Sequence, residues 1–202
     1  DHEVFCSEKV RRIGDPIAFV VAKDQKTCDL ALKNIIVEYE EIKGVFDPIE
    51  AMKEDCPKVH GDSNILYHFK IRKGNVEEGF KNSHVIVENT YKTHMVDHAF
   101  LQPEAGVSFI DEEGRITVIV ATQYPHYDKE EIASALKIPE DTVRVINANV
   151  GGAFGGREDI SLQIHLALAA KELKRPVKTV YSRPESFISH SKRHAMVMKY
   201  KT

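Results

Sequence analysis

The hydrophobic pattern of the first 56 residues predicts a small unit of strands and helices. Ile17 to Ala22 is a continuous apolar run, which is typical of a strand buried on both faces. Asp24 can cap a helix whose apolar positions recur at helical spacing, and residues 36–42 then alternate as a half-buried strand does. Strand, helix and strand within about 30 residues favour a βαβ crossover. A short helix with proline at its first position is expected at residues 47–52.

A stretch of turn-forming residues separates this unit from the rest of the chain. Pro57, Gly61, Asp62, Ser63 and Asn64 favour irregular chain. We therefore expect one domain at residues 1–56, a linker at 57–66 and a second domain at 67–202. The fold class predicted by this mixture of elements is α+β.

The second domain shows alternating and helical periods in turn. Asp128 and Glu131 have the spacing of a capping box and predict the start of a helix that Pro139 ends. The expected elements are a one-turn helix at 73–80, strands at 83–94, 105–110 and 115–121 with a turn at 111–114, the helix from 128, a strand at 142–148, a helix from about 159 and a strand at 177–181.

Composition excludes several functional classes. The 202 residues are 42% hydrophobic and 29% charged, and the net charge is −3, which argues against a general nucleic-acid or membrane-surface binder. The basic run at residues 192–194 is short, and we interpret it as a solvated strand entrance. Cys6, Cys28 and Cys56 form neither a disulfide framework nor a CxxC metal pattern, so we expect a cytoplasmic protein.

Four glycines surround one aromatic residue in the most distinctive stretch, residues 149–159, Asn-Val-Gly-Gly-Ala-Phe-Gly-Gly-Arg-Glu-Asp. Glycine allows positive φ and close approach of another group, so the stretch predicts a tight loop with exposed amides. A helix expected to begin near Asp159 would add free N–H groups and a dipole that attracts anions. A plain strand-to-helix turn is about equally compatible with this spacing. The P-loop motif does not fit, because Arg157-Glu158 stands where a P-loop has Lys-Ser/Thr, and a dinucleotide-binding motif would need glycine where Ala153 or Phe154 stands.

Two histidines form a weaker candidate site. His94 and His98 are four residues apart, and on a helix they could face one metal ion. The region has the pattern of strand and loop, so partial burial or surface exposure is the favoured interpretation.

Several segments together resemble the large subunit of the xanthine dehydrogenase and aldehyde oxidase family, the molybdenum hydroxylases. Val150 to Glu158 is similar to the family's Gly-Gly-x-Phe-Gly-Gly-Lys-Glu motif. Ala121 to Pro125 is similar to its Ser/Ala-Thr-Gln-x-Pro segment, and the likeness continues at residues 182–187 and 192–194. Residues 10–17 and 37–41 resemble its α/β-hammerhead domain. The resemblance therefore implies a hammerhead domain followed by the first, incomplete part of a molybdopterin-binding domain.

The resemblance also implies a cofactor site. The family's molybdenum is held by the dithiolene sulfurs of molybdopterin, so the protein supplies neutral donors around it rather than metal ligands. By the resemblance, Gln123 hydrogen-bonds a molybdenum oxygen, and the Phe154-Gly155 backbone approaches the metal's ligands. Gly152, Ala153 and Gly156 shape the cradle. Ala153 replaces a glycine seen in many members, so its φ should be negative.

By the resemblance, Glu158 occupies the position that contacts substrate in purine-hydroxylating members of the family. This favours a purine-like heterocycle over an aldehyde as the substrate. Glu158 has a competing interpretation, because an acidic residue in the first turn of a helix commonly just complements the helix dipole. The competing interpretation of Gln123 is a polar residue at the end of a strand. The sequence Leu-Gln-Pro-Glu at residues 101–104 departs from the family's Leu-Glu-Pro-His and leaves the substrate class open.

The chain is expected to be a piece of a longer subunit. The family's base glutamate, its further pterin-binding loops, and its iron–sulfur and FAD domains have no counterpart in these 202 residues. The resemblance thus implies that the catalytic base lies outside the chain, and that the chain by itself neither retains cofactor nor turns over. The alternative is a non-catalytic module whose glycine-rich loop holds an anion such as a nucleotide phosphate.

Overall fold

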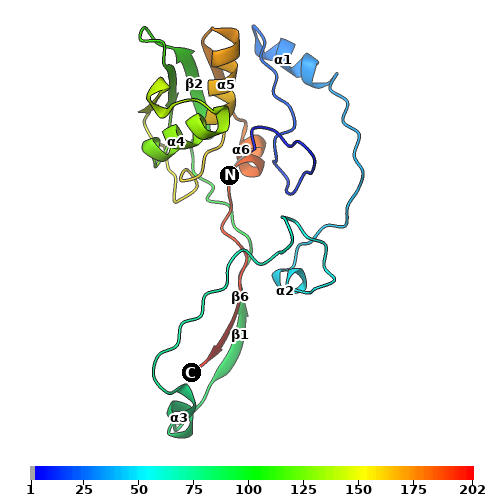
Figure 1. The fold of residues 1–202 in the computed structure, drawn as a ribbon, viewed down its shortest axis with the longest axis vertical. Helices are drawn as coiled ribbons and strands as arrows, with labels where there is room; N and C mark the ends of the chain where they lie inside the picture. The colour runs from blue at the N-terminus through cyan, green and yellow to red at the C-terminus, as the bar shows by residue number, and fades with distance from the viewer. Residues whose placement is uncertain (1–2) are drawn as a thin grey trace. The chain divides into compact units, whose positions relative to one another are not determined.

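The computed structural model describes residues 3–202 (Figure 1). Contacts between residues divide the chain into two compact units. The first unit combines the chain up to Val37 with Asp97–Arg193, and the second combines Glu38–Val96 with His194–Thr202. The sequence-based domain boundary at residues 57–66 stays a prediction.

A four-stranded sheet in the order β4-β3-β2-β5 forms the centre of the first unit. Strand β2 (Ala105–Ile110) pairs antiparallel with both β3 (Ile116–Val120) and β5 (Val177–Val180). Strand β4 (Val143–Asn147) runs parallel to β3. A parallel pair needs a crossover connection, which helix α4 provides. The chain therefore does contain a βαβ unit, but it lies here and not at the N-terminal end of the sequence.

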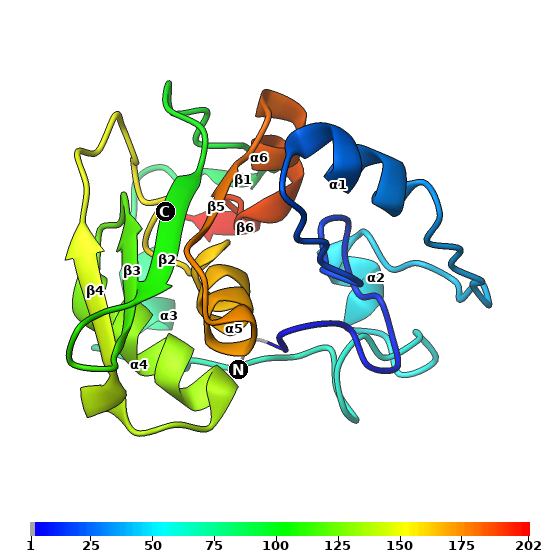
Figure 2. The same ribbon diagram turned by 90° about the horizontal axis from the view of Figure 1, so that it is seen from above.

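Two helices cover one face of this sheet. Helix α4 (Pro125–Leu136) packs on β4, α5 (Gln163–Leu173) packs on β2 and β3, and the helices contact each other (Figure 2). The core between the sheet and these two helices is apolar. Its fully buried members include Val118, Ile132 and Leu166. Burial of this set is the main source of stability for the unit that carries the glycine-rich loop.

The start of α4 differs from the sequence-based prediction. The helix begins at Pro125, three residues before Asp128, and no side chain caps it. Asp128 is instead fully buried within the helix, where its carboxylate accepts a hydrogen bond of 3.1 Å from the Gln163 amide. The capping-box prediction was wrong because this tertiary hydrogen bond between α4 and α5 uses the carboxylate.

Burial raises the pKa of Asp128, against the opposing hydrogen bonds from Gln163 and Thr122. A carboxyl whose pKa is higher in the folded state stabilises the fold below its unfolded pKa of about 3.9, and this contribution is lost as the pH rises through the folded value. Asp128→Asn should therefore flatten the pH dependence of the free energy of unfolding above about pH 4. Urea unfolding of the full-length protein measures this, with the exposed Asp62→Asn as control. An unchanged pH slope would contradict the prediction.

The first 43 residues form fewer elements than predicted. Helix α1 (Gln25–Leu32) is present, and the Asp24 side chain accepts from Thr27 N at its start, as expected. The strands predicted at 17–22 and 36–42 are extended segments without ladder partners among residues 3–202, and several of their apolar side chains are exposed. A strand needs a neighbour to satisfy its backbone groups, and an apolar run alone does not supply one.

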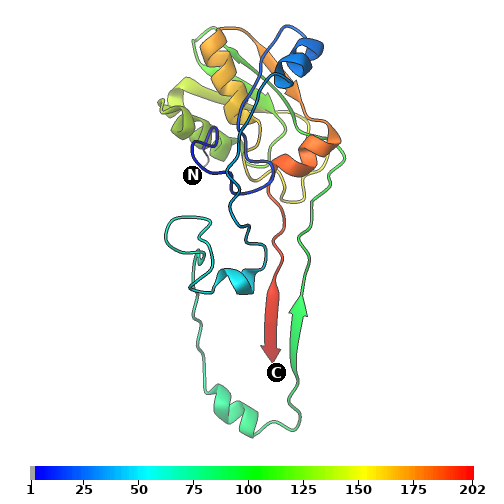
Figure 3. The same ribbon diagram turned by 90° about the vertical axis from the view of Figure 1, so that its right-hand side faces the viewer.

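The second unit contains two short helices and a two-stranded ribbon. Helix α2 (Pro48–Ala51) begins with proline as predicted, and α3 (Val76–Lys81) confirms the predicted one-turn helix. Strands β1 (Glu88–Lys92) and β6 (Val197–Lys201) pair antiparallel (Figure 3). The predicted strand at 83–94 is thus shorter than expected. None of the helices in residues 3–202 is long and apolar enough to cross a membrane.

Candidate functional site

The glycine-rich loop leaves the end of β4 and reaches α5 only at Gln163. Gly152 and Gly155 adopt φ values of +100° and +91°, and Phe154 adopts +55°, so three of its residues have left-handed backbone. Ala153 does not have a positive φ, as predicted. The expectation of a helix beginning near Asp159 was wrong, so the dipole of α5 does not act on the loop. The chemistry of the glycine-rich loop therefore depends on the amides of the loop and on the side chains around it.

Gln123 is bound directly to this loop. Its side-chain oxygen accepts hydrogen bonds from Gly155 N at 3.1 Å and from Arg157 N at 3.2 Å, while its backbone N donates to Arg157 O. Two N–H donors require an oxygen at this position, which fixes the orientation of the amide. The Gln123 Nε2 group has no acceptor in the described part of the chain, and it remains a donor for another group.

Only part of the loop offers free amides. Gly151 N donates to Gln102 Oε1 at 2.7 Å and Gly156 N to Ala153 O at 2.9 Å. The amides of Gly152, Ala153 and Phe154 have no acceptor within residues 3–202. The Gly155 amide is used by Gln123, so the available donors lie one to three residues earlier, and the approach of the Phe154-Gly155 backbone to a ligand stays a prediction.

Arg157 holds the loop from inside. The side chain is 4% exposed, and its guanidinium donates to three carbonyls, those of Gly152, Ala121 and Gln102. It also lies over the Phe100 ring at 4.3 Å. Burial lowers the pKa of Arg157, against the attraction of Glu104. The buried Arg157 side chain therefore joins the loop to Ala121, directly after β3, and to Gln102.

Two glycines are required because the segment at residues 97–104 packs directly on them. A Cβ at Gly156 would lie 2.8 Å from His98 Nδ1 and 2.9 Å from Phe100 Cε1, and one at Gly152 would lie 3.1 Å from Phe100 Cβ. Residues 97–104 therefore form the back wall of the loop. His98, considered above as a metal ligand, is half-buried in this wall.

The opposite side of the loop is open. A Cβ built on Gly155 would meet only His98 Nε2 at 3.7 Å and Glu158 Oε1 at 4.0 Å, so the space beside Gly155 is free to receive another group. The Phe154 side chain is 77% exposed at this place, whereas Ala153 is buried. Glu158 is exposed and precedes α5 by several residues. The helix-dipole interpretation of Glu158 was therefore wrong.

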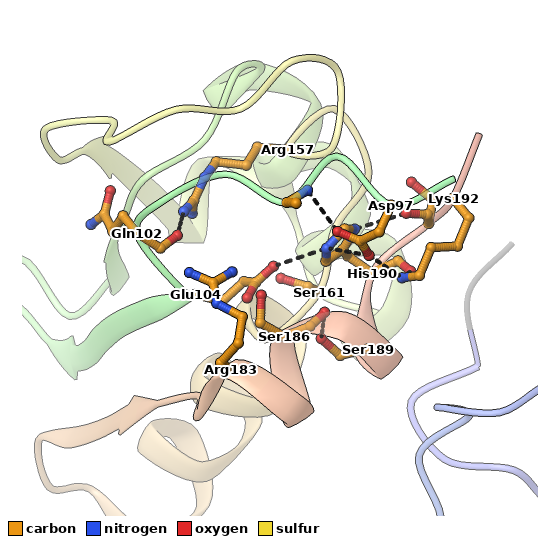
Figure 4. Close-up of polar contacts among 12 residues, drawn as sticks. Asp97, Gln102, Glu104, Arg157, Ser161, Arg183, Ser186, Ser189, His190 and Lys192 are labelled. Atoms are coloured by element: carbon orange, nitrogen blue, oxygen red, sulfur yellow. Dashed lines mark hydrogen bonds and ion pairs between the residues drawn. The ribbon is translucent and has the colours of Figure 1, made fainter. Parts of the chain in front are cut away.

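Sequence reasoning missed the residues that support the back wall. Helix α6 (Arg183–Ser189) begins with a capping box at Ser182, and Arg183 donates to Leu101 O at 2.6 Å. His190 follows α6 and is buried between Asp97 and Glu104 (Figure 4). Lys192, interpreted from the sequence as solvated, forms an ion pair of 3.1 Å with Asp97. The capping-box pattern at residues 182–185 and the proline at position 184 were signals in the sequence for α6.

The fold and this loop define the chain as a molybdopterin-binding segment of the aldehyde oxidase and xanthine dehydrogenase type. Residues 59–202 match the family described as "Molybdopterin cofactor-binding domain", and residues 1–43 match "Aldehyde oxidase and xanthine dehydrogenase, a/b hammerhead domain". The chain belongs to this family. The predicted resemblance, fold class and cofactor class are confirmed at this level.

Similar proteins include subunits named for nicotinate dehydrogenase and for xanthine dehydrogenase. The chain is 46% identical over its full length to the nicotinate dehydrogenase large molybdopterin subunit of Eubacterium barkeri and covers 48% of that protein. It is 36% identical over its full length to a probable xanthine dehydrogenase subunit of Bacillus subtilis and covers 27% of it. The chain thus spans about half, or less, of the length of these relatives.

Solved structures show the same fold. The aldehyde oxidoreductase of Desulfovibrio gigas superposes with a TM-score of 0.92 at 23% identity, covering 98% of this chain and 22% of that one. A Cu,Mo-CO dehydrogenase superposes with a TM-score of 0.83 at 26% identity, covering 98% and 27%.

The donor set around the loop fits a molybdenum–molybdopterin group. The free donors are the Gln123 amide and the backbone N–H groups of Gly152, Ala153 and Phe154, all of which are neutral and cannot compete as metal ligands. The open space at Gly155 offers room beside them. Within residues 3–202 there is no group of three or more His, Cys, Asp or Glu side chains that could bind a metal directly.

Proposed function

We propose that the glycine-rich loop and Gln123 hold the molybdenum end of a molybdopterin cofactor, and that the complete protein is a molybdenum hydroxylase. The observation that carries the proposal is the orientation of Gln123, whose oxygen is bound by two loop amides and whose Nε2 is free. Gly152, Ala153, Phe154, Gly155 and Gly156 form the cradle. The family membership of the chain supports this assignment.

Each loop residue has a separate part in this arrangement. When bound, the cofactor supplies oxygen transfer from water to carbon and accepts the two electrons of the oxidation. Gln123 Nε2 and the amides of Gly152 and Phe154 donate hydrogen bonds that orient the cofactor's oxygen atoms. The exposed Phe154 ring lies beside Gly152, and a cofactor bound against it would exclude water, which strengthens such hydrogen bonds.

We further propose an aromatic heterocycle as substrate, with an aldehyde as the alternative. Glu158 Oε1 lies at the same opening as the space beside Gly155, where it can accept a hydrogen bond from a ring N–H or hydroxyl group. Two relatives are named for nicotinate and xanthine, which are both nitrogen heterocycles, and their names support this choice over an aldehyde.

Glu158→Gln should raise KM for a heterocyclic substrate, with little change in the molybdenum content of the protein. Gln keeps one acceptor oxygen but loses the charge. A hydrogen bond to a charged group contributes about 1.5–3 kcal/mol and a neutral one about 0.5–1.5 kcal/mol, so kcat/KM should fall by about 5- to 12-fold. Steady-state kinetics on xanthine, nicotinate and an aromatic aldehyde measure this, with the exposed Glu130→Gln as control. Equal kinetics of Glu158→Gln and the control would remove Glu158 from the substrate site.

Electron transfer away from the cofactor and the supply of the catalytic base require other parts of the complete protein. We propose iron–sulfur and FAD domains or subunits as electron acceptors, the remainder of the large subunit as the source of the base, and a cytoplasmic location. The 202-residue chain alone is expected neither to retain cofactor nor to turn over substrate.

Analysis of the purified full-length protein tests the proposed function. We expect molybdenum and pterin in near-stoichiometric amounts by metal analysis and by fluorescence of the oxidised pterin. A pure, folded protein that lacks both after expression with functional cofactor synthesis would overturn the proposal. Tight binding of a nucleotide by such a protein would favour the anion-binding module instead.

A further inference from the structure

Two polar side chains face the open space beside Gly155, and the proposed substrate site uses only one of them. A Cβ built on Gly155 would lie 4.0 Å from Glu158 Oε1 and 3.7 Å from His98 Nε2, and apart from the adjoining loop residues it would meet nothing else within 4 Å. An ionised carboxylate only accepts hydrogen bonds, whereas an imidazole nitrogen that carries a hydrogen donates one. The opening therefore combines an acceptor with an imidazole ring.

The surroundings of the His98 ring indicate which nitrogen carries the hydrogen. Nδ1 is buried and has no hydrogen-bond partner among the described residues, whereas Nε2 is not buried. A buried N–H group without an acceptor is rarer in folded proteins than a buried acceptor without a donor. We therefore assign the hydrogen of the neutral ring to Nε2, and a charged ring carries one there as well. In both states Nε2 can donate to a group in the opening.

The backbone around His98 is held in an uncommon conformation. Ala99, the next residue, adopts φ +49°, a left-handed conformation that few residues with a Cβ adopt. The Ala99 amide donates to Asp97 Oδ1 at 2.7 Å, and Lys192 Nζ lies 3.1 Å from Asp97 Oδ2 (Figure 4). Strained backbone persists only where the surrounding structure holds it, and it is concentrated at functional sites. The turn at residues 97–99 therefore fixes the position from which His98 reaches the loop.

The glycine-rich loop is shaped to receive the His98 ring. A Cβ at Gly156 would lie 2.8 Å from His98 Nδ1 and 2.9 Å from its Cγ, so only glycine leaves room for the ring at this place. The His190 ring lies 5.7 Å from the His98 ring, measured between centroids. Side chains packed this closely rarely change rotamer without displacing their neighbours. The packing therefore keeps Nε2 at the opening.

We propose that His98 is a specificity-determining residue, whose Nε2 donates a hydrogen bond to a ring nitrogen or exocyclic oxygen of the heterocycle that Glu158 also binds. The inference rests on the proposed function, because it adds a second contact to the same substrate. A donor and an acceptor at one opening match a heterocycle that presents an acceptor atom together with a ring N–H or hydroxyl group. Benzaldehyde, by comparison, presents an acceptor alone.

The Glu158 carboxylate distinguishes this opening from the part of the loop proposed to hold the cofactor. The donors assigned to cofactor oxygens are Gln123 Nε2 and the amides of residues 152–154. The space beside Gly155 instead faces a carboxylate, which repels the electron-rich oxygens of a molybdenum group. Because His98 Nε2 shares this space with the carboxylate, we assign its hydrogen bond to the substrate.

Two substitutions in the full-length protein separate the donor from the shape of the ring. His98→Leu removes the donor and leaves an acceptor of the heterocycle without a partner, so KM and Kd should rise by about 5- to 150-fold while kcat changes little. His98→Gln keeps an Nε2 donor and should lie closer to wild type. The control is His84→Leu, because His84 is exposed. Steady-state kinetics and equilibrium titration with xanthine and nicotinate measure the effect, alongside molybdenum content and urea unfolding.

The outcomes separate a hydrogen bond to the substrate from packing and from cofactor binding. Equal KM and Kd in His98→Leu and the control would overturn the inference, as would equal losses in His98→Leu and His98→Gln. Lost molybdenum at unchanged KM would assign His98 to the cofactor and overturn it too. Should His98→Leu not fold, wild type with 15N-labelled histidine decides: the heterocycle should shift the Nε2 resonance that is absent from His98→Gln, and an unshifted resonance counts against the contact.

Failure of this inference and failure of the proposed function give different results. A wild-type protein without molybdenum would refute the proposed function. A molybdenum-loaded wild type whose KM is unchanged by His98→Leu would refute the role of His98 alone. A loaded wild type that neither oxidises nor binds xanthine or nicotinate would also overturn the inference, because no heterocycle would then remain for His98 to bind.

Discussion

Gln123→Glu should leave the glycine-rich loop folded and lower turnover of the full-length protein by about 100-fold or more. A glutamate keeps an oxygen to accept from Gly155 N and Arg157 N, but it loses the Nε2 donor. Loss of one such preorganised donor typically costs about 2.7–4 kcal/mol in the transition state. The carboxylate also brings a negative charge toward the cofactor's oxygen atoms. The measurements are kcat with a heterocyclic substrate and protection of loop amides against hydrogen exchange.

Gln123→Ala separates the two parts of the side chain. It removes the acceptor as well as the donor, so two loop amides lose their partner at about 1–3 kcal/mol each. We expect Gln123→Ala to lose both turnover and loop protection, and Gln123→Glu to lose turnover alone. If Gln123→Glu turned over like the wild type, the Nε2 group would have no part in the reaction. A loop as unprotected in Gln123→Glu as in Gln123→Ala would show that the two hydrogen bonds do not hold it.

Gly156→Ala is the second change with a large expected effect. Its Cβ would lie within 3 Å of the His98 and Phe100 rings, which belong to the back wall and cannot turn away freely. Overpacking of this kind costs about 1–3 kcal/mol, and it should displace the amides of the loop. We expect a lower free energy of unfolding in urea and a loss of most of the molybdenum from the purified full-length protein.

Gly79→Ala provides the matched control for this substitution. No heavy atom lies within 4 Å of a Cβ at Gly79, and the residue is inside α3. Alanine should stabilise this helix position by roughly 0.5–1 kcal/mol. If Gly156→Ala had the same stability and molybdenum content as Gly79→Ala, residues 97–104 would accommodate the added methyl group without a loss in the free energy of unfolding.

The amino-acid sequence determined the elements whose signals are local. The Asp24 cap of α1, the proline at the start of α2 and the turn between β2 and β3 depend on neighbouring residues only, and each is present as predicted. The negative φ expected for Ala153 likewise follows from its own side chain. The motif at residues 150–158 led to the correct family, because its order of residues is itself the feature that relatives share.

Only the tertiary structure decided which groups face one another. Gln123 and the loop are about 30 residues apart in the sequence, and nothing local indicates that one amide oxygen binds two loop amides. The capping box predicted at Asp128 failed because a hydrogen bond from Gln163 uses that carboxylate. Glu104 and His190 are separated by 86 positions and meet only where α6 ends behind the loop. Local signals fix the conformation of a segment, whereas the partners of a polar group depend on how distant segments pack.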